Sequence, residues 1–209
     1  MRFSAARRRD RSVLQRQHAG RSRQGGNHSA KDRRVTAPQR IIGVVGWKNS
    51  GKTRMVAALV AELTGRGWKV STIKHAHHAF DIDKPGADSW QHRQAGASEV
   101  AIVSGRRWAL MHENTQGESE PPLDEIVGKL SPCDIVLVEG YKRGDHDKIE
   151  IRRAVSETGT PLAPGDAHVV AVVGDAEDTD RLPVFPADAI ADIADFIERH
   201  TGLRNGEPS

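Results

Sequence analysis

The segment Gly46–Thr53, with the sequence GWKNSGKT, has the residue types and spacing that suit a nucleotide phosphate. In the pattern GxxxxGK[ST] the glycines let backbone N–H groups turn around phosphate oxygens, the lysine reaches the β- and γ-phosphates, and the hydroxyl binds Mg²⁺. A glycine-rich turn without a ligand is the alternative, but a predicted strand before the motif and a predicted helix after it disfavour that alternative. The predicted phosphate-binding residues are Gly46, Lys48, Asn49, Ser50, Gly51, Lys52 and Thr53.

A carboxylate that orients the metal is expected at the end of a neighbouring buried strand. The run DIVLVEG begins with Asp134 and carries Glu139 near its end. In open α/β sheets ligands bind at the carboxyl ends of the strands. Glu139 is therefore predicted to lie beside the metal, and Asp134 to cap the start of the strand.

Recognition of the base is less well defined by the sequence. An Asn-Lys-x-Asp signature for guanine is absent, and a later apolar run ends in VVGD at Asp175. A carboxylate at that point could accept the N1 and N2 protons of guanine, while an ordinary turn aspartate is an equal alternative. Asp175 is the candidate base-binding residue, and the choice between GTP and ATP stays open.

The polar loop KHAHHAFDIDKPGADS, at 74–89, combines histidines with aspartates. One use is a switch-type loop near the γ-phosphate, where its carboxylates reach Mg²⁺ directly or through water and its cations meet phosphate oxygens. The other is a zinc or nickel site. The histidine spacing is poor for a preformed structural site and the chain has one cysteine, Cys133, so the first use is preferred.

The elements that would position these residues follow from apolar periodicity. Helices are predicted over 52–66, 89–97, 122–130 and 188–200, strands over 40–45, 68–75, 134–141, 147–153 and 167–175, and an antiparallel pair over 98–113. Strands that alternate with helices predict an α/β fold. We expect a P-loop NTPase three-layer sandwich, with a mostly parallel sheet, helices on both faces and some antiparallel strands.

Two predicted strands have a purely structural interpretation. Trp108, Leu110 and Met111 in the antiparallel pair could fill a sheet face or a dimer interface. The run KIEIRR could be a solvated strand with Lys148, Glu150 and Arg152 on one face.

The charge is unevenly distributed along the 209 residues. Residues 1–39 hold eleven basic and two acidic residues, a charge of +9, so that residues 40–209 carry −6 of the formal +3. The first segment has few large apolar residues and no periodicity, which predicts a disordered basic tail at 1–39 before one domain at 40–209. An acidic domain disfavours nucleic acid as a partner, and no apolar run reaches the length of a membrane span. A cytoplasmic protein is expected.

Four segments together are similar to one family: GWKNSGKT, TIKHAHHAFDIDKPGADSWQHRQAGA, SGRRWALMHE and DIVLVEGYKRGDHDKIEIRR. From about Arg40 to His200 the chain resembles the molybdopterin-guanine dinucleotide biosynthesis adaptor family. The second and fourth segments are much more specific than the phosphate loop.

The resemblance implies a homodimeric P-loop protein that binds GTP with Mg²⁺ and has weak GTPase activity. Its implied role is to assist the molybdenum cofactor guanylyltransferase, which joins GMP to molybdopterin. On matching positions Gly46–Thr53 would hold phosphates, Thr53, Asp83 and Glu139 would lie near the metal, and Lys52 and Asp83 would act in hydrolysis. The EGYKRG loop would border the nucleotide or cofactor. Trp47 stands where a KGGxGK motif has its signature lysine.

Two other functions stay open on the residues alone. A P-loop small-molecule kinase would need an arginine-rich lid with a catalytic aspartate, for which the available cations are Arg106, Arg107, Lys142 and Arg143. A nickel-delivery GTPase would need a histidine-rich tail, and residues 1–39 contain only His18 and His28.

Overall fold

The computed structural model describes residues 40–76, 80–114, 117–153, 159–174 and 182–203. The predicted tail at 1–39 and the candidate base-binding residue Asp175 lie outside the described residues.

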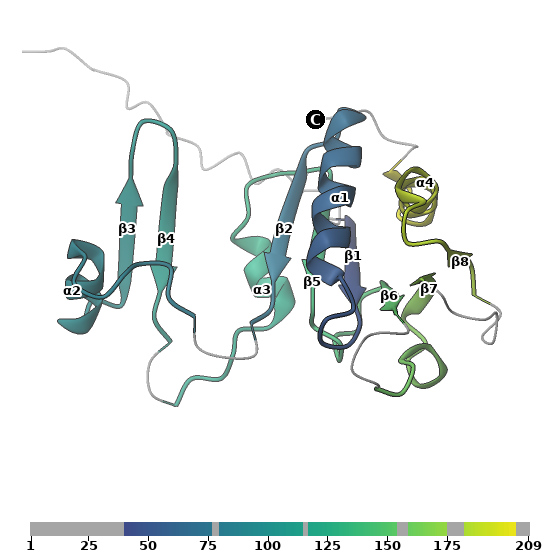
Figure 1. The fold of residues 1–209 in the computed structure, drawn as a ribbon. Helices are drawn as coiled ribbons and strands as arrows, with labels where there is room; N and C mark the ends of the chain where they lie inside the picture. Colours follow the sequence, from purple (N-terminus) through teal and green to yellow (C-terminus); the bar gives the residue numbers. More distant parts are fainter. Residues whose placement is uncertain (1–39, 77–79, 115–116, 154–158, 175–181, 204–209) are drawn as a thin grey trace, which may run out of the picture. The chain divides into compact units, whose positions relative to one another are not determined.

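A six-stranded parallel sheet forms the centre of the fold, in the order β2-β5-β1-β6-β7-β8 (Figure 1). Its central strands are short apolar runs rich in β-branched residues, which suits strands buried on both faces. This confirms the mostly parallel sheet predicted from the sequence. The strands are β1 (Arg40–Val45), β2 (Val70–Lys74), β5 (Ile135–Glu139), β6 (Lys148–Arg152), β7 (Val169–Gly174) and β8 (Val184–Phe185).

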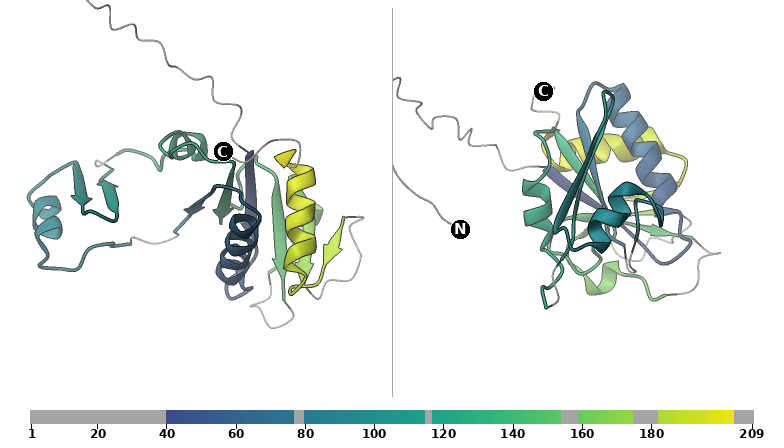
Figure 2. Two further views of the ribbon diagram at one scale, coloured as in Figure 1. Left: turned by 90° about the horizontal axis from the view of Figure 1, so that it is seen from above. Right: turned by 90° about the vertical axis from the view of Figure 1, so that its left-hand side faces the viewer.

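Helices cover both faces of this sheet, as predicted. Helices α1 (Lys52–Gly65) and α4 (Ile190–His200) pack side by side on one face (Figure 2). Fully buried side chains such as Leu59, Leu63 and Ile193 form the larger core there. Helix α3 (Leu123–Gly128) packs on the other face against Val136 and Val138. A 3-10 turn, η1 (Ala163–Gly165), precedes β7.

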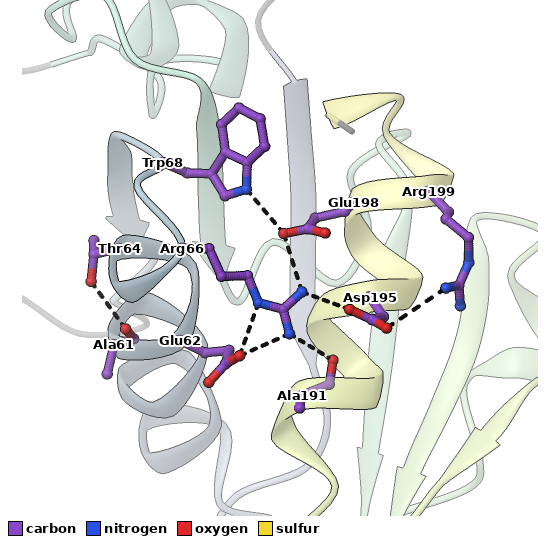
Figure 3. Close-up of polar contacts among 9 residues, drawn as sticks. All are labelled: Ala61, Glu62, Thr64, Arg66, Trp68, Ala191, Asp195, Glu198 and Arg199. Carbon is purple, nitrogen blue, oxygen red and sulfur yellow. Dashed lines mark hydrogen bonds and ion pairs between the residues drawn. The ribbon is translucent and has the colours of Figure 1, made fainter. Parts of the chain in front are cut away.

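A polar cluster joins the C-terminal end of α1 to α4 (Figure 3). The Arg66 guanidinium donates to Glu62 on its own helix and to Asp195 on α4, at 2.9 and 2.6 Å, and lies 3.2 Å from Glu198. Trp68 Nε1 also donates to Glu198, at 2.9 Å. Burial lowers the pKa of Arg66, but the hydrogen bonds to the three carboxylates raise it by more, so the net shift is upward. The cluster therefore stabilises the packing of the two helices.

A second, two-stranded sheet forms from β3 (Glu99–Val103) and β4 (Trp108–His112), which pair antiparallel as predicted. The short helix α2 (Asp88–Gln94) packs against β3. Val100 and Met111 are buried, whereas Val103, Trp108 and Leu110 on the alternate positions are exposed, Trp108 by 68%. One face of this hairpin is thus an apolar surface open to solvent.

The solvated interpretation of β6 is wrong. Lys148 and Glu150 are buried, because the segments before and after β6 supply their partners, the backbone oxygen of Gly144 among them. Lys148 Nζ pairs with Asp166 at 2.8 Å, and Glu150 accepts hydrogen bonds from the backbone N–H groups of Leu162 and Ala163. The alternating charges of this strand therefore hold a loop in place instead of facing water.

Candidate functional site

The phosphate loop and Glu139 meet at the carboxyl edge of the sheet. Strands β1 and β5 are parallel neighbours with Val44 opposite Glu139, so the loop that follows β1 lies next to this carboxylate. Thr53 Oγ1 donates a hydrogen bond to Glu139 Oε1 at 2.7 Å. The hydroxyl and the carboxylate predicted to face a metal are thus in contact, and both are oxygen donors of the kind that Mg²⁺ prefers.

Asp134, at the other end of β5, has the capping role predicted for it. Its carboxylate accepts a hydrogen bond from the backbone N–H of Lys69 at 2.7 Å, and its side chain is buried. Because it lies at the start of the strand, it is on the edge of the sheet opposite the phosphate loop.

The backbone of the loop is arranged for an anion. Asn49 and Gly51 have positive φ angles of 63° and 96°, and the turn that they make presents N–H groups at the start of α1. In α1, all of which the structure describes, no side chain caps the first turn and no acidic residue lies in it. The buried Ser50 hydroxyl has no hydrogen-bond partner among the described residues. Unpaired donors at a helix N-terminus favour a bound anion.

Two lysines, Lys52 and Lys74, lie near the Glu139 carboxylate, and Lys142 lies near Lys52. Lys52 Nζ donates to the backbone oxygen of Trp47 at 2.7 Å, and Lys74 Nζ lies 3.4 Å from Glu139. Burial and then the nearby Lys142 ammonium lower the pKa of Lys52, and Glu139 offsets them only in part. The surroundings therefore disfavour positive charge at Lys52, which a bound polyanion would reverse.

A cavity of about 330 Å³ adjoins the loop, a volume at the lower end of the range found for ligand pockets. It lies between the first turns of α1, the end of β6 and the segment that joins β8 to α4. Arg54 and Arg153 line it together with Asp188. A cavity beside a phosphate loop has the place of a nucleoside site.

Asp83 lies in a different group of contacts. Arg93 donates to Asp83 at 2.6 Å and also pairs with Asp81 and Glu113, so this cluster ties the polar loop to α2 and β4. The hydrogen bonds from Arg93 lower the pKa of Asp83. Its role in metal binding and catalysis stays a prediction, and it requires that Asp83 leave Arg93.

Other predicted residues are placed as follows. Gly46, Lys48, Asn49, Ser50, Gly51, Lys52 and Thr53 form one continuous loop and helix start. His77 and His78 lie outside the described residues, and within the described part no group of three or more metal-binding side chains occurs. No helix among the described residues is long and apolar enough to span a membrane.

Sequence reasoning did not assign Arg54, Arg153 or Asp188 to the site, and it placed Lys142 there only as a member of the EGYKRG loop that the resemblance implies. Asp188 was missed because β8 is only two residues long and gives no periodic pattern. A lysine three residues after Glu139, in the EGYKRG loop, was a usable signal, because that loop begins at the ligand edge of the sheet.

Comparison with known proteins gives a consistent result. A family described as molybdopterin guanine dinucleotide synthesis protein B matches residues 41–175. The molybdopterin-guanine dinucleotide biosynthesis adapter protein of Escherichia coli is 33% identical over 168 residues, which are 79% of this chain and 95% of that protein. The adapter protein of Haemophilus influenzae is 38% identical over 161 residues, 76% of this chain and 87% of that one.

Solved structures have the same fold. A crystal structure of molybdopterin-guanine biosynthesis protein B is similar with a TM-score of 0.60 at 28% identity, covering 78% of this chain and 99% of that chain. The MobB protein of Bacillus subtilis has a TM-score of 0.59 at 22% identity, with 78% and 98% covered, which shows likeness of fold. The P-loop NTPase type of fold predicted from the sequence is therefore confirmed.

Proposed function

The chain belongs to the molybdopterin guanine dinucleotide synthesis protein B family and has an adapter role in molybdopterin guanine dinucleotide biosynthesis, and from this premise we propose that it binds GTP with Mg²⁺. Within that role it assists the molybdenum cofactor guanylyltransferase. Any hydrolysis of GTP by this chain is slow.

The observation that carries the nucleotide proposal is the arrangement around Glu139. Thr53 touches this carboxylate, and the cations Lys52 and Lys74 gather on the same side. A bound phosphate chain would place negative charge beside these lysines, and its metal ion would place positive charge beside the Glu139 carboxylate. Thr53 and Glu139 would hold Mg²⁺, directly or through water, and Lys52 would bind the phosphates.

The cavity beside α1 supports a nucleoside at the same site. Asp188 at its wall is an acceptor that could bind the N–H groups of a guanine, and the predicted Asp175 follows the end of β7. Arg54 and Arg153 in the wall suit the phosphate nearest the ribose. Preference for GTP over ATP is part of the proposal.

A thermal-shift experiment tests the nucleotide proposal. With Mg²⁺ and GTP at about 100 times Kd, ligand binding should stabilise the protein by about 2.7 kcal/mol and raise Tm by about 5–10 °C. ATP should raise Tm less. An equal shift with ATP would contradict guanine preference, and no shift with either nucleotide at millimolar concentration would overturn nucleotide binding altogether.

A second copy of the chain is proposed as the partner of the exposed hairpin face. Val103 and Trp108 lie directly opposite each other in the register, as do Ala101 and Leu110, and all four are exposed. An apolar face of this kind marks a protein contact. Burial of the two hairpin faces against each other would give a homodimer.

Light scattering after gel filtration tests this partner. The double variant Trp108→Ser and Leu110→Ser should be monomeric at concentrations where the unchanged chain is dimeric. Val184→Ser, which removes an exposed apolar side chain from β8, is the matched control and should stay dimeric. A monomeric unchanged chain would contradict the proposal.

The adapter role leads to two further partners, the guanylyltransferase and molybdopterin. A pull-down of the guanylyltransferase with molybdopterin, with and without GTP, tests whether the nucleotide controls the complex. We also propose that residues 40–209 form the complete nucleotide-binding domain. Removal of residues 1–38 should leave the GTP-dependent Tm shift unchanged.

A further inference from the structure

We propose that Lys142 is a second phosphate-binding cation, which the aromatic face of Trp47 holds at the terminal-phosphate end of the loop. The inference rests on the proposed nucleotide-binding function and adds a residue to that same site.

Trp47 is fixed in position by the chain on its far side. Its Nε1 donates to the backbone oxygen of Thr160 at 2.9 Å, and its ring packs so closely on Gly159 that a Cβ there would overlap the ring. The same residue is the second of the phosphate loop, and its backbone oxygen accepts the hydrogen bond from Lys52. The ring is therefore a rigid platform attached to the loop.

Lys142 rests on this platform. Its ammonium lies 4.1 Å from the centroid of a Trp47 ring, which is the geometry of a cation–π contact. Burial lowers the pKa of Lys142. Among the described residues no carboxylate forms an ion pair with Lys142. Its charge therefore remains available to an anion.

The backbone before Lys142 brings it to the loop. Gly140 and Tyr141 follow Glu139 with φ angles of 98° and 51°. A positive φ is costly for a bulky residue such as tyrosine and persists only where the surroundings maintain it. The Tyr141 ring packs on His75, with 4.5 Å between the ring centroids. This turn comes directly before Lys142, whose ammonium lies on the Trp47 ring.

The neighbours of Lys142 identify the part of the ligand that it would contact. The nucleoside cavity is lined by Arg54 and Arg153. Glu139 and Lys74, in contrast, lie on the side where a metal would bridge the β- and γ-phosphates. Lys142 rests on the ring of Trp47, whose backbone oxygen accepts the hydrogen bond from Lys52. Because the lysine of this motif reaches the β- and γ-phosphates, Lys142 beside it would contact the terminal phosphate. It would supply from the β5–β6 loop the cation that the phosphate loop itself lacks at Trp47.

Calorimetric titration with a non-hydrolysable GTP analogue and with GDP tests the inference on the full-length protein. Lys142→Gln should weaken binding of the triphosphate analogue by about tenfold or more, the loss expected for a charge-assisted hydrogen bond to phosphate. GDP, which lacks the terminal phosphate, should bind with an affinity changed by less than about twofold. Lys142→Arg should retain most of the triphosphate affinity, because it keeps the charge and the stacking on Trp47.

Lys129→Gln is the control for loss of one positive charge, since Lys129 on the surface pairs with Glu125 at 2.9 Å. Trp47→Phe should keep the triphosphate preference and Trp47→Leu should reduce it, because only the first keeps an aromatic face. If the unchanged protein binds the analogue and Lys142→Gln binds it equally well, the role of Lys142 is overturned while nucleotide binding stands. If the unchanged protein binds neither ligand, the proposed function itself fails.

Discussion

The two ends of helix α1 carry charged clusters of opposite character. At the C-terminal end the Arg66 guanidinium has carboxylate partners on α1 and α4, and its pKa is raised (Figure 3). At the N-terminal end Lys52 has a backbone oxygen as its close partner, and burial with Lys142 lowers its pKa. The first environment favours the charge that it contains, and the second opposes it.

This difference separates a structural cluster from a binding site. When the fold raises the pKa of a basic group such as Arg66, the partners that favour its charge lie within the fold, so the cluster contributes to stability. When the fold lowers the pKa of a basic group such as Lys52, its charged form is destabilised in the free protein, and a bound anion would stabilise that form. Mutations at the N-terminal end should therefore change ligand affinity, and mutations at the C-terminal end should change stability.

The largest effect is expected for Lys52→Ala. Loss of the lysine should weaken GTP binding by about a hundredfold or more, equivalent to about 2.7 kcal/mol, because the charged hydrogen bonds to two phosphates disappear. The free energy of unfolding without ligand should change little, since the lysine is disfavoured in the free protein. Calorimetry and urea unfolding measure the two quantities. If Lys52→Ala is unfolded without ligand, the expectation that mutations at this end of α1 change affinity and not stability is contradicted.

A comparable effect on stability is expected for Arg66→Met. Removal of the guanidinium leaves the buried Glu198 carboxylate without its charged partner and should lower the free energy of unfolding by about 2 kcal/mol. Arg199→Met is the matched control, because Arg199 is exposed and lies 3.9 Å from Asp195. GTP affinity measured below the unfolding transition should be unchanged in both. A large loss of affinity in Arg66→Met would contradict the separation of the two clusters.

A smaller effect is expected for Thr53→Ala. Without the hydroxyl that touches Glu139, the gain in GTP affinity on adding Mg²⁺ should fall by about tenfold, since one metal ligand is lost. Thr53→Ser keeps the hydroxyl and should behave like the unchanged protein. Titrations with Mg²⁺ and with EDTA measure the difference. Equal Mg²⁺ dependence in the alanine and serine variants would argue against a metal at this hydroxyl.

The smallest effect is expected from pH. The pKa of Lys52 in the free folded protein lies below its ordinary value of about 10.4. At a pH between the folded and the unfolded pKa, the unfolded chain binds more protons than the folded protein, so the free energy of unfolding rises with pH. Phosphate binding favours the charged lysine and should therefore take up protons in the same range, so that affinity falls as pH rises. Calorimetry in two buffers of different ionisation enthalpy measures the uptake. Proton release on binding would contradict a lowered pKa of Lys52 in the free protein.

The sequence predicted the elements whose patterns are local. The apolar run before Gly46, the helix from Lys52 and the antiparallel pair around Ser104 were all confirmed, because periodicity and turn residues act over a few positions. The placement of Glu139 at the edge beside the phosphate loop and of Asp134 at the opposite edge was also correct, since strand direction alone places one at each edge of the sheet, while the metal role of Glu139 stays a prediction. In these cases nearest-neighbour rules were sufficient.

Other features depended on residues far away in the chain. The alternating run KIEIRR gave no sign that Lys148 and Glu150 would be buried, because several of their partners come from 162–166. Asp83 was assigned to the metal by resemblance, but Arg93 pairs with it. Strand β8 has too few residues for a periodic signal, although the segment after it lines the cavity.

By itself the sequence determined a buried strand and a helix joined by a glycine-rich loop, and it predicted that this loop binds phosphate, because the motif consists of eight consecutive residues. Only the tertiary structure decided which other charges face the loop. Lys142 reaches Trp47 through a backbone turn after β5, and Arg66 finds its carboxylates on α4. Coulombic and hydrogen-bond energies depend on distances in space, and a linear pattern contains those distances only for near neighbours.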